Sequence, residues 1–169
     1  ELTPQVKDGL LRAHVHSYWG HWYSRFRTWR GEDAQACVAV IGAAREAGER
    51  RLLSLHVARY PYYQVLRSDY RAACRTAEEG LQLAVEVGDV FDYMYCQYYW
   101  AWALLHVGEW GEMLRILGDG TRMAERNEHR LASTLFQLEL AWLHEQAFDF
   151  ARACELCERG LAEARQSEH

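Results

Sequence analysis

Residues that interrupt helices are scarce in this sequence, and long apolar runs are absent. Proline occurs 2 times and glycine 12 times in 169 residues, while 50% of the residues are hydrophobic. This composition is typical of a folded helical domain and not of a disordered chain. No apolar run approaches the roughly 20 residues of a membrane-spanning helix, and residues 1–5 lack the pattern of a signal peptide. We therefore expect a cytoplasmic protein with no membrane partner.

Positive charge is also scarce, and it is unevenly distributed along the chain. The formal net charge is −5. Residues 1–75 carry 12 Lys and Arg against 7 Asp and Glu, a balance of +5, whereas residues 76–169 carry 7 against 17, a balance of −10. An acidic chain without a basic run argues against nucleic acid as the main ligand. The uneven charge favours head-to-tail association of copies, although solvated surfaces that merely differ in charge are the simpler interpretation.

The cysteines and histidines do not form a recognisable metal site. The 5 cysteines are odd in number and fall inside apolar helical stripes, so we expect reduced, buried thiols and no disulfides. Cys154 and Cys157 have the spacing of a metal or redox motif, but they occupy packing positions and no histidine follows at a suitable distance. His14 and His21 share one helical face and offer at most two ligands. We expect no metal and no cofactor.

Residues typical of catalysis are not arranged together either. Glu139, His144 and Glu145 fall in one predicted helix, yet His144 and Glu145 point to different faces and no nucleophile pairs with them. There is no glycine-rich phosphate-binding loop, because the glycines fall at helix ends and at close-packing positions. The sequence therefore predicts a protein that is not an enzyme and has no catalytic residues.

The sequence instead repeats itself with a period of 40 residues. Similar residue types return in four columns, which are Trp22, Tyr62, Trp102 and Trp142; Ala44, Ala84, Ala124 and Ala164; Gly80, Gly120 and Gly160; and Tyr70, Trp110 and Phe150. Apolar residues within each repeat follow helical spacing, and turns of two or three residues separate them. The pattern predicts a single domain, residues 1–169, whose four antiparallel helix hairpins cover about residues 10–48, 49–88, 89–128 and 129–166.

Eight helices follow from this pattern. The first begins at Thr3 and Pro4 or after Gly9 and ends near Trp29, and Arg30 and Gly31 break the chain before the second. The other seven are expected at about residues 33–47, 50–66, 69–87, 89–107, 109–126, 128–146 and 148–166. Pro61 should kink or break the third, because proline removes a helical hydrogen bond and clashes with the preceding turn.

The second helix of each hairpin carries a stripe of small and medium side chains, which we expect to be buried. Its members, in chain order of the four hairpins, are Ala34, Cys37, Ile41 and Ala44; Cys74, Ala77, Leu81 and Ala84; Leu114, Leu117, Thr121 and Ala124; and Cys154, Cys157, Leu161 and Ala164. Gly48, Gly88 and Asn127 are expected to end three of these helices.

These hairpins resemble the tetratricopeptide repeat family over about residues 10 to 166. In the third repeat, Ala101 matches the small residue of the first helix, Gly108-Glu109-Trp110 the turn, and Gly120 a small residue of the second helix. The period of 40 exceeds the family's usual length of about 34. It is similar to the long repeats of bacterial signal-transduction ATPases and maltose-activator-type regulators. The resemblance implies an all-α, right-handed solenoid that serves as the interaction or sensor segment of a larger bacterial regulator.

The resemblance also implies that the aromatic column lines the concave surface of the solenoid. The residues of this candidate groove are Tyr18, Trp22, Arg59, Tyr62, Tyr98, Trp102, His106 and Trp142, with Arg59 and His106 as polar anchors at its edge. Such a groove would hold a peptide or a helix of a protein partner. Two further hypotheses stay open, namely a small sugar-like effector as the ligand and self-assembly of the chain into a homo-oligomer. Alternatively, the rings only fill the wide interface that a long repeat creates.

Overall fold

The computed structural model of the chain describes residues 9–26 and 31–166, and within them it is all-helical, without a strand. The expected helix start at Thr3 and Pro4, and the end near Trp29 and Arg30, lie outside the described residues. The elements are α1 (Gly9–Phe26), α2 (Gly31–Ala47), α3 (Arg50–Val57), α4 (Tyr60–Leu66), α5 (Tyr70–Val87), α6 (Val90–Val107), α7 (Trp110–Arg126), α8 (Arg130–Gln146) and α9 (Phe150–Gln166).

The predicted third helix is broken into α3 and α4, which confirms the expected effect of Pro61. The proline lies in the first turn of α4, where it has no helical hydrogen bond to lose. The two helices are separated by Ala58 and Arg59.

The helix ends follow from local hydrogen bonds and from backbone conformation. The Asp89 carboxylate accepts a hydrogen bond from the backbone N–H of Asp92 at 2.9 Å, which caps the start of α6. Left-handed residues follow the helix ends, and they are Gly48, Ser68, Gly88, Gly108, Glu128 and Phe148. The predicted end at Gly88 is confirmed with φ +71°, whereas after α7 the left-handed residue is Glu128 and not Asn127.

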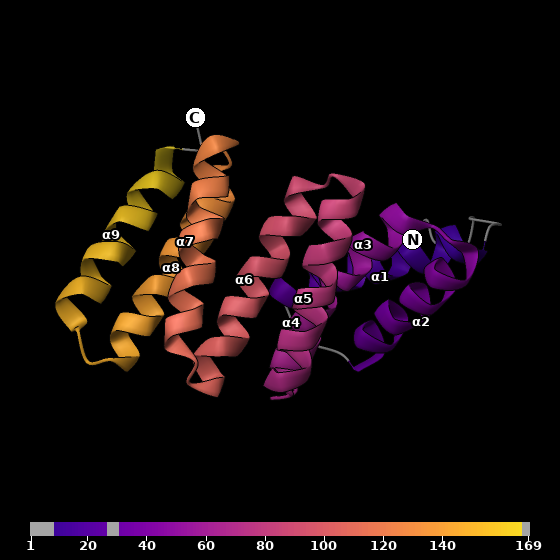
Figure 1. Ribbon diagram of the computed structural model, residues 1–169, viewed down its shortest axis with the longest axis horizontal. Helices are drawn as coiled ribbons and strands as arrows, with labels where there is room; N and C mark the ends of the chain where they lie inside the picture. The colour runs from indigo at the N-terminus through magenta and orange to yellow at the C-terminus, as the bar shows by residue number, and fades with distance from the viewer. Residues whose placement is uncertain (1–8, 27–30, 167–169) are drawn as a thin grey trace.

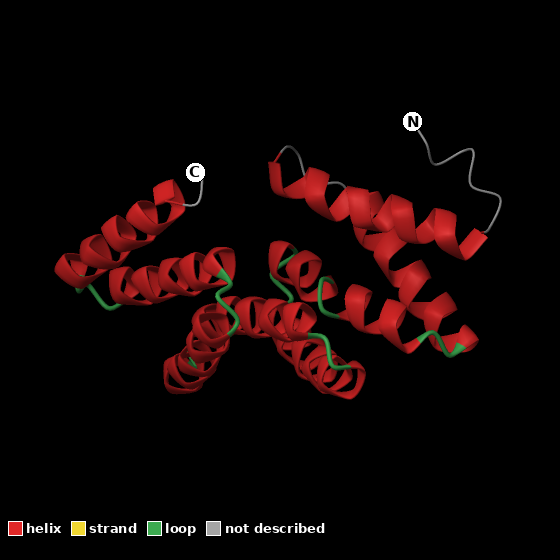
Figure 2. Ribbon diagram, turned by 90° about the horizontal axis from the view of Figure 1, so that it is seen from above, coloured by secondary structure: helices red, strands yellow, loops and turns green. Residues whose placement is uncertain are grey.

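The helices pack in chain order, each against the next (Figure 1). α6 additionally contacts α4 on one side and α8 on the other. Seen from above, the row of helices is bent, so that α1 and α9 at its two ends lie on the same side of the molecule (Figure 2). We call the side toward which the row bends the inner side. On this side, α6 contacts α4 and α8.

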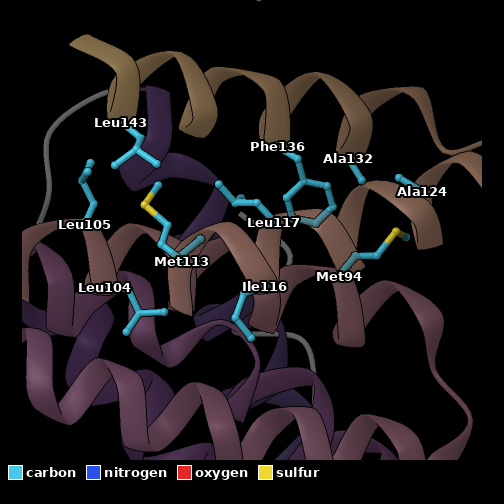
Figure 3. Packing of buried hydrophobic residues seen from close by; sticks show 11 residues of the cluster. Met94, Leu104, Leu105, Met113, Ile116, Leu117, Ala124, Ala132, Phe136 and Leu143 are labelled. Carbon is cyan, nitrogen blue, oxygen red and sulfur yellow. The ribbon is translucent and has the colours of Figure 1, made fainter. Parts of the chain in front are cut away.

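The largest core cluster joins α6, α7 and α8 (Figure 3). Met113 and Leu117 of α7 lie between Leu105 of α6 and Phe136 of α8 in this cluster. Gly120 makes the approach of α7 to α8 possible, because a Cβ atom there would lie 2.5 Å from Cζ of Phe136. A small residue is thus required at this crossing.

The predicted packing stripe is confirmed in α2 and wrong in α9. In α2 the four stripe residues are all buried, including Cys37. In α9 the buried residues are Ala153, Leu156 and Gly160, whereas Cys154 and Cys157 are exposed. The reason is that α9 packs mainly against α8, and no described helix covers its other side. All 5 cysteines are free thiols, as expected, but they are not all buried.

Candidate functional site

A row of aromatic rings crosses the molecule from α1 to α8. The Tyr62 and Trp102 ring centroids are 6.3 Å apart, and those of Trp102 and Trp142 are 6.1 Å apart. Trp22 joins the row through His21, whose ring lies 6.2 Å from Trp22 and 5.1 Å from Tyr62. Sequence analysis did not include His21 in the row, because it precedes the tryptophan column by one residue.

Tyr18, Tyr98 and His106 extend the row on both sides of the column. The Tyr18 ring lies 6.3 Å from Trp22, and the Tyr98 ring lies 6.5 Å from Trp102. His106 stacks on Tyr70 at 4.5 Å and meets the edge of Trp142 at 5.9 Å. Seven of the eight candidate residues are therefore connected by ring contacts, most of them in the separation range of favourable aromatic pairs.

Exposure to solvent increases along this row from α4 to α8. Tyr62 is 7% exposed, Tyr98 and Trp102 are half-buried, and Trp142 is 37% exposed. His106 is exposed as well. The row therefore belongs to the core at α4 and reaches the surface between α6 and α8. Tyr18 and Trp22 on α1 are half-buried.

Arg59 lies inside the protein and not at an exposed edge, which differs from the expected placement. Its Nη1 donates hydrogen bonds to Oδ1 of Asp92 at 2.9 Å and to the Leu55 carbonyl at 2.6 Å. The guanidinium carbon lies 5.0 Å from the Tyr95 ring centroid, and Ser54 donates to the other Asp92 oxygen at 2.9 Å. Burial raises the pKa of Asp92 despite the adjacent Arg59. Arg59 thus ties the break between α3 and α4 to α6.

A second buried polar cluster joins α1, α2 and α3. Nδ1 of His14 lies 2.9 Å from Nε2 of His56, and the Ser17 hydroxyl lies 3.1 Å from Nδ1 of His56. The Cys37 thiol donates to the His56 carbonyl at 3.6 Å. Burial lowers the pKa of His56 to about 3 and raises the pKa of Cys37 to about 12. Both groups are neutral at pH 7, so the cluster holds no thiolate nucleophile and serves to join the helices.

The described residues contain no group of three or more His, Cys, Asp or Glu side chains that could hold a metal ion. His14 and His21, which share a face of α1, are not joined as ligands. His14 faces His56, whereas His21 packs among the rings of Tyr62, Tyr63 and Tyr99.

Glu139 of α8 is a buried carboxyl group beside the aromatic row. It is 3% exposed, and burial raises its pKa to about 8, so the carboxyl is mostly protonated at pH 7. The Tyr98 hydroxyl donates a hydrogen bond to this carboxyl group, while Oε2 has no partner. Sequence analysis considered Glu139 only as a catalytic candidate and did not place it in the groove.

An apolar pocket extends the aromatic row toward the first turns of α6 and α8. Its cavity volume is about 20 Å³, and it is open to solvent on one side. Its lining residues are Phe91, Met94, Tyr95, Tyr98, His129, Leu131, Ala132, Leu135 and Phe136. Tyr98 belongs both to the pocket and to the row. We call the pocket, together with Tyr98, Trp102, His106 and Trp142, the α6–α8 furrow.

The fold and this furrow define an all-helical protein with an open aromatic surface on one side. A comparison with models of known families finds no match to the chain, and a search among curated proteins finds none. No helix among residues 9–26 and 31–166 is both long and apolar enough to cross a membrane. The furrow and the resemblance of the repeats are therefore the features that point to a function.

Proposed function

We propose that the chain is a non-catalytic scaffold that binds a peptide or a helix of a protein partner in the α6–α8 furrow. The observation that carries the proposal is the change of the aromatic row from core at Tyr62 to surface at Trp142. Large rings that remain accessible next to an apolar pocket provide contact area at low cost in side-chain entropy. Exposed apolar surface of this kind is typical of interaction sites.

We further propose that the hairpins form a right-handed, tetratricopeptide-like solenoid with a period of 40 residues. The left-handed turn residues support this repeat, because Gly48, Gly88 and Glu128 are spaced by 40, as are Ser68, Gly108 and Phe148. The contacts of α6 with α4 and α8 are also those expected of stacked first helices. By its resemblance, the chain would be the interaction or sensor segment of a larger bacterial regulator.

The dimensions of the furrow favour a helix or a short extended segment as the ligand. From Phe91 to His106, α6 rises by about 22 Å, which is the length of about four helical turns. One apolar side chain of the ligand would enter the pocket, and others would lie over Tyr98, Trp102 and Trp142. Since residues 76–169 carry a balance of −10, basic residues beside the apolar ones would favour association.

A small-molecule effector is the second candidate ligand, and the pocket is the observation that favours it. Its cavity volume of about 20 Å³ is far below the range of roughly 300–1,000 Å³ for small-molecule sites, so only one group of such a ligand would enter it. The lining is almost entirely apolar, so the hydroxyl groups of a sugar would lose water without gaining partners. An aromatic or alkyl group fits this lining better than the sugar-like effector expected from the sequence.

Selection of peptides from a displayed library of amphipathic helices tests the proposed function. The affinity of a selected peptide would then be measured by fluorescence anisotropy for the native chain, for Trp142→Ala and for Trp110→Ala. Trp110 of α7 is a matched control, because it is 39% exposed and lies outside the furrow. We expect Trp142→Ala to weaken binding about 30-fold or more, as for an aromatic hot spot, and Trp110→Ala to leave it unchanged.

Two results would contradict the proposed function. The library could yield no binder, or every selected peptide could bind Trp142→Ala as tightly as the native chain. Competition with a small aromatic compound such as indole separates the two candidate ligands. A compound that binds the pocket while no peptide does would favour the effector.

A further inference from the structure

The packing interface between one hairpin and the next, which we call the joint, occurs three times within the chain. In each joint, the second helix of a hairpin presents small or apolar residues to the first helix of the next, as α2 does to α3, α5 to α6 and α7 to α8. A Cβ at Gly80 would lie 2.7 Å from Sγ of Cys96, and a Cβ at Gly120 would lie 2.5 Å from Phe136. These joints are close-packed and follow one register.

One half of the same joint is open on α9. Residues 40 positions before Cys157 and Leu161 are Leu117 and Thr121 of α7, where Leu117 is fully buried by α8. Cys157 itself is exposed, and Leu161 is 52% exposed, whereas Ile41 in the same register of α2 is buried. α9 thus presents an exposed apolar stripe. The corresponding stripe of α2 is covered by α3.

The other half of the joint is open on α1. Trp19 is 64% exposed, whereas Arg59, Tyr99 and Glu139, which lie 40, 80 and 120 positions later, are all buried. His16 is exposed in the same way, although His56 in its register is fully buried against Cys37 of α2. Among the described residues, no helix precedes α1 to cover its outer face, as α2, α5 and α7 cover the corresponding faces of α3, α6 and α8.

We propose that a second copy of this chain docks head to tail, with α1 of one copy packed on α9 of the other. The two open faces are the two halves of a joint that the chain already forms three times, so a second copy would continue the stack in register. α9 itself carries three Arg and three Glu, so the contact would be formed by the apolar side chains of the two faces and not by opposite net charges.

A head-to-tail contact between identical chains is heterologous, so it leaves one open face at each end. Association can then continue beyond the dimer unless the stack closes into a ring. The proposal does not depend on the α6–α8 furrow, which lies on the inner side and stays open in the stack.

Sedimentation velocity over a concentration series tests the proposal. We expect the average mass to rise above the 19.7 kDa of one chain as the concentration increases. The rise should persist at high salt, because salt screens charges and the proposed contact is formed by apolar side chains.

Two variants test the two halves separately. Leu161→Arg places a positive charge in the α9 stripe, and Trp19→Glu places a negative charge on the α1 face, so each should be monomeric alone. Mixed together, they should form a 1:1 dimer and nothing larger, because one variant retains a native α1 face and the other a native α9 stripe. Leu114→Arg is the matched control, since Leu114 of α7 is 49% exposed but lies within the stack.

The outcomes separate clearly once circular dichroism has shown that each variant keeps its helices. A native chain that stays monomeric at every protein and salt concentration overturns the proposal. The exposed stripe of α9 would then be a surface for a helix of another protein. Assembly that survives in Leu161→Arg or Trp19→Glu overturns it as well, as does a mixture that remains monomeric. Loss of assembly in Leu114→Arg would show that the contact lies elsewhere.

Discussion

The polar joint among the first helices α1, α3 and α6 and the apolar joint between α7 and α8 both hold successive hairpins together, but their chemistry differs. The first holds Arg59, Asp92, His14 and His56 in buried hydrogen bonds. The second holds the apolar side chains around Phe136. A buried polar network must be fully satisfied, so it fixes one arrangement of the helices, whereas apolar packing is less specific in geometry.

The difference explains where the aromatic row is open. At α4, Arg59 is drawn inward by Asp92, and the rings of Tyr18 and Tyr95 close over its guanidinium at 5.7 and 5.0 Å. Between α6 and α8 no such ion pair is present among the described residues, and Glu139 occupies the register of Arg59. The polar joint thus stabilises the N-terminal part, while the apolar joint leaves surface for a ligand.

The largest effect is expected from breaking the polar joint at Arg59. Arg59→Met leaves the Asp92 carboxylate buried without its partner, which should cost about 3–5 kcal/mol in the free energy of unfolding by urea. Arg115→Met is the control, because Arg115 forms exposed ion pairs worth at most about 1 kcal/mol. The double variant Arg59→Met/Asp92→Leu should recover much of the loss. A loss in Arg59→Met no larger than in the control would contradict a structural role for the pair.

The two regions should respond to pH in opposite directions. The pKa of His56 is lowered to about 3 in the folded protein, so the unfolded chain binds the proton more tightly and stability is lost as pH falls from about 6.5 toward 3. The pKa of Glu139 is raised from 4.5 to about 8, so its contribution to stability is fully present below pH 4.5 and is lost as pH rises from there to about 8. Each slope is at most about 1.4 kcal/mol per pH unit.

Urea unfolding across this pH range measures both slopes. Glu139→Gln should remove the loss of stability between about pH 4.5 and 8 and leave the loss from His56 at lower pH unchanged, because glutamine keeps the shape of the side chain without its titration. A loss between pH 4.5 and 8 that persists in Glu139→Gln would show that another group titrates there.

A smaller effect tests the apolar joint through two glycines of α7. Gly120→Ala places a Cβ against the Phe136 ring and should cost about 1–3 kcal/mol by overpacking. Gly118→Ala is the matched control, because its Cβ would meet only Arg122 at an ordinary 3.5 Å. Alanine there should stabilise the helix by about 0.5–1 kcal/mol. Thermal unfolding measures whether each substitution raises or lowers the stability of the protein. Equal effects of the two substitutions would contradict the close crossing of α7 and α8.

What the sequence predicted well was local. Pro61 predicts the break before α4, and Gly88 predicts the end of α5, because proline and glycine act through their own backbone conformation. The burial of Cys154 and Cys157 was predicted wrongly for a non-local reason. A stripe is buried only where another helix covers it, and its residue types do not reveal whether that helix is present.

The candidate site was predicted in part for the same reason. The period of 40 residues identifies the aromatic column, and the ring contacts of Trp102 with Tyr62 and Trp142 follow from it. The pairing of Arg59 with Asp92 and of His14 with His56 joins residues 33 and 42 positions apart, outside the register of 40. The pocket depends on the relative placement of α6 and α8, which no short pattern specifies.

The central claim is that the aromatic row is core at α4 and open surface at α8. The most direct measurement is the free energy of unfolding of Tyr62→Ala and Trp142→Ala, each compared with the native chain. We predict a loss of about 3–5 kcal/mol for Tyr62→Ala, as for a buried aromatic side chain, and about 1 kcal/mol or less for Trp142→Ala. Equal and large losses would contradict the claim, because they would show that Trp142 is as much a part of the core as Tyr62.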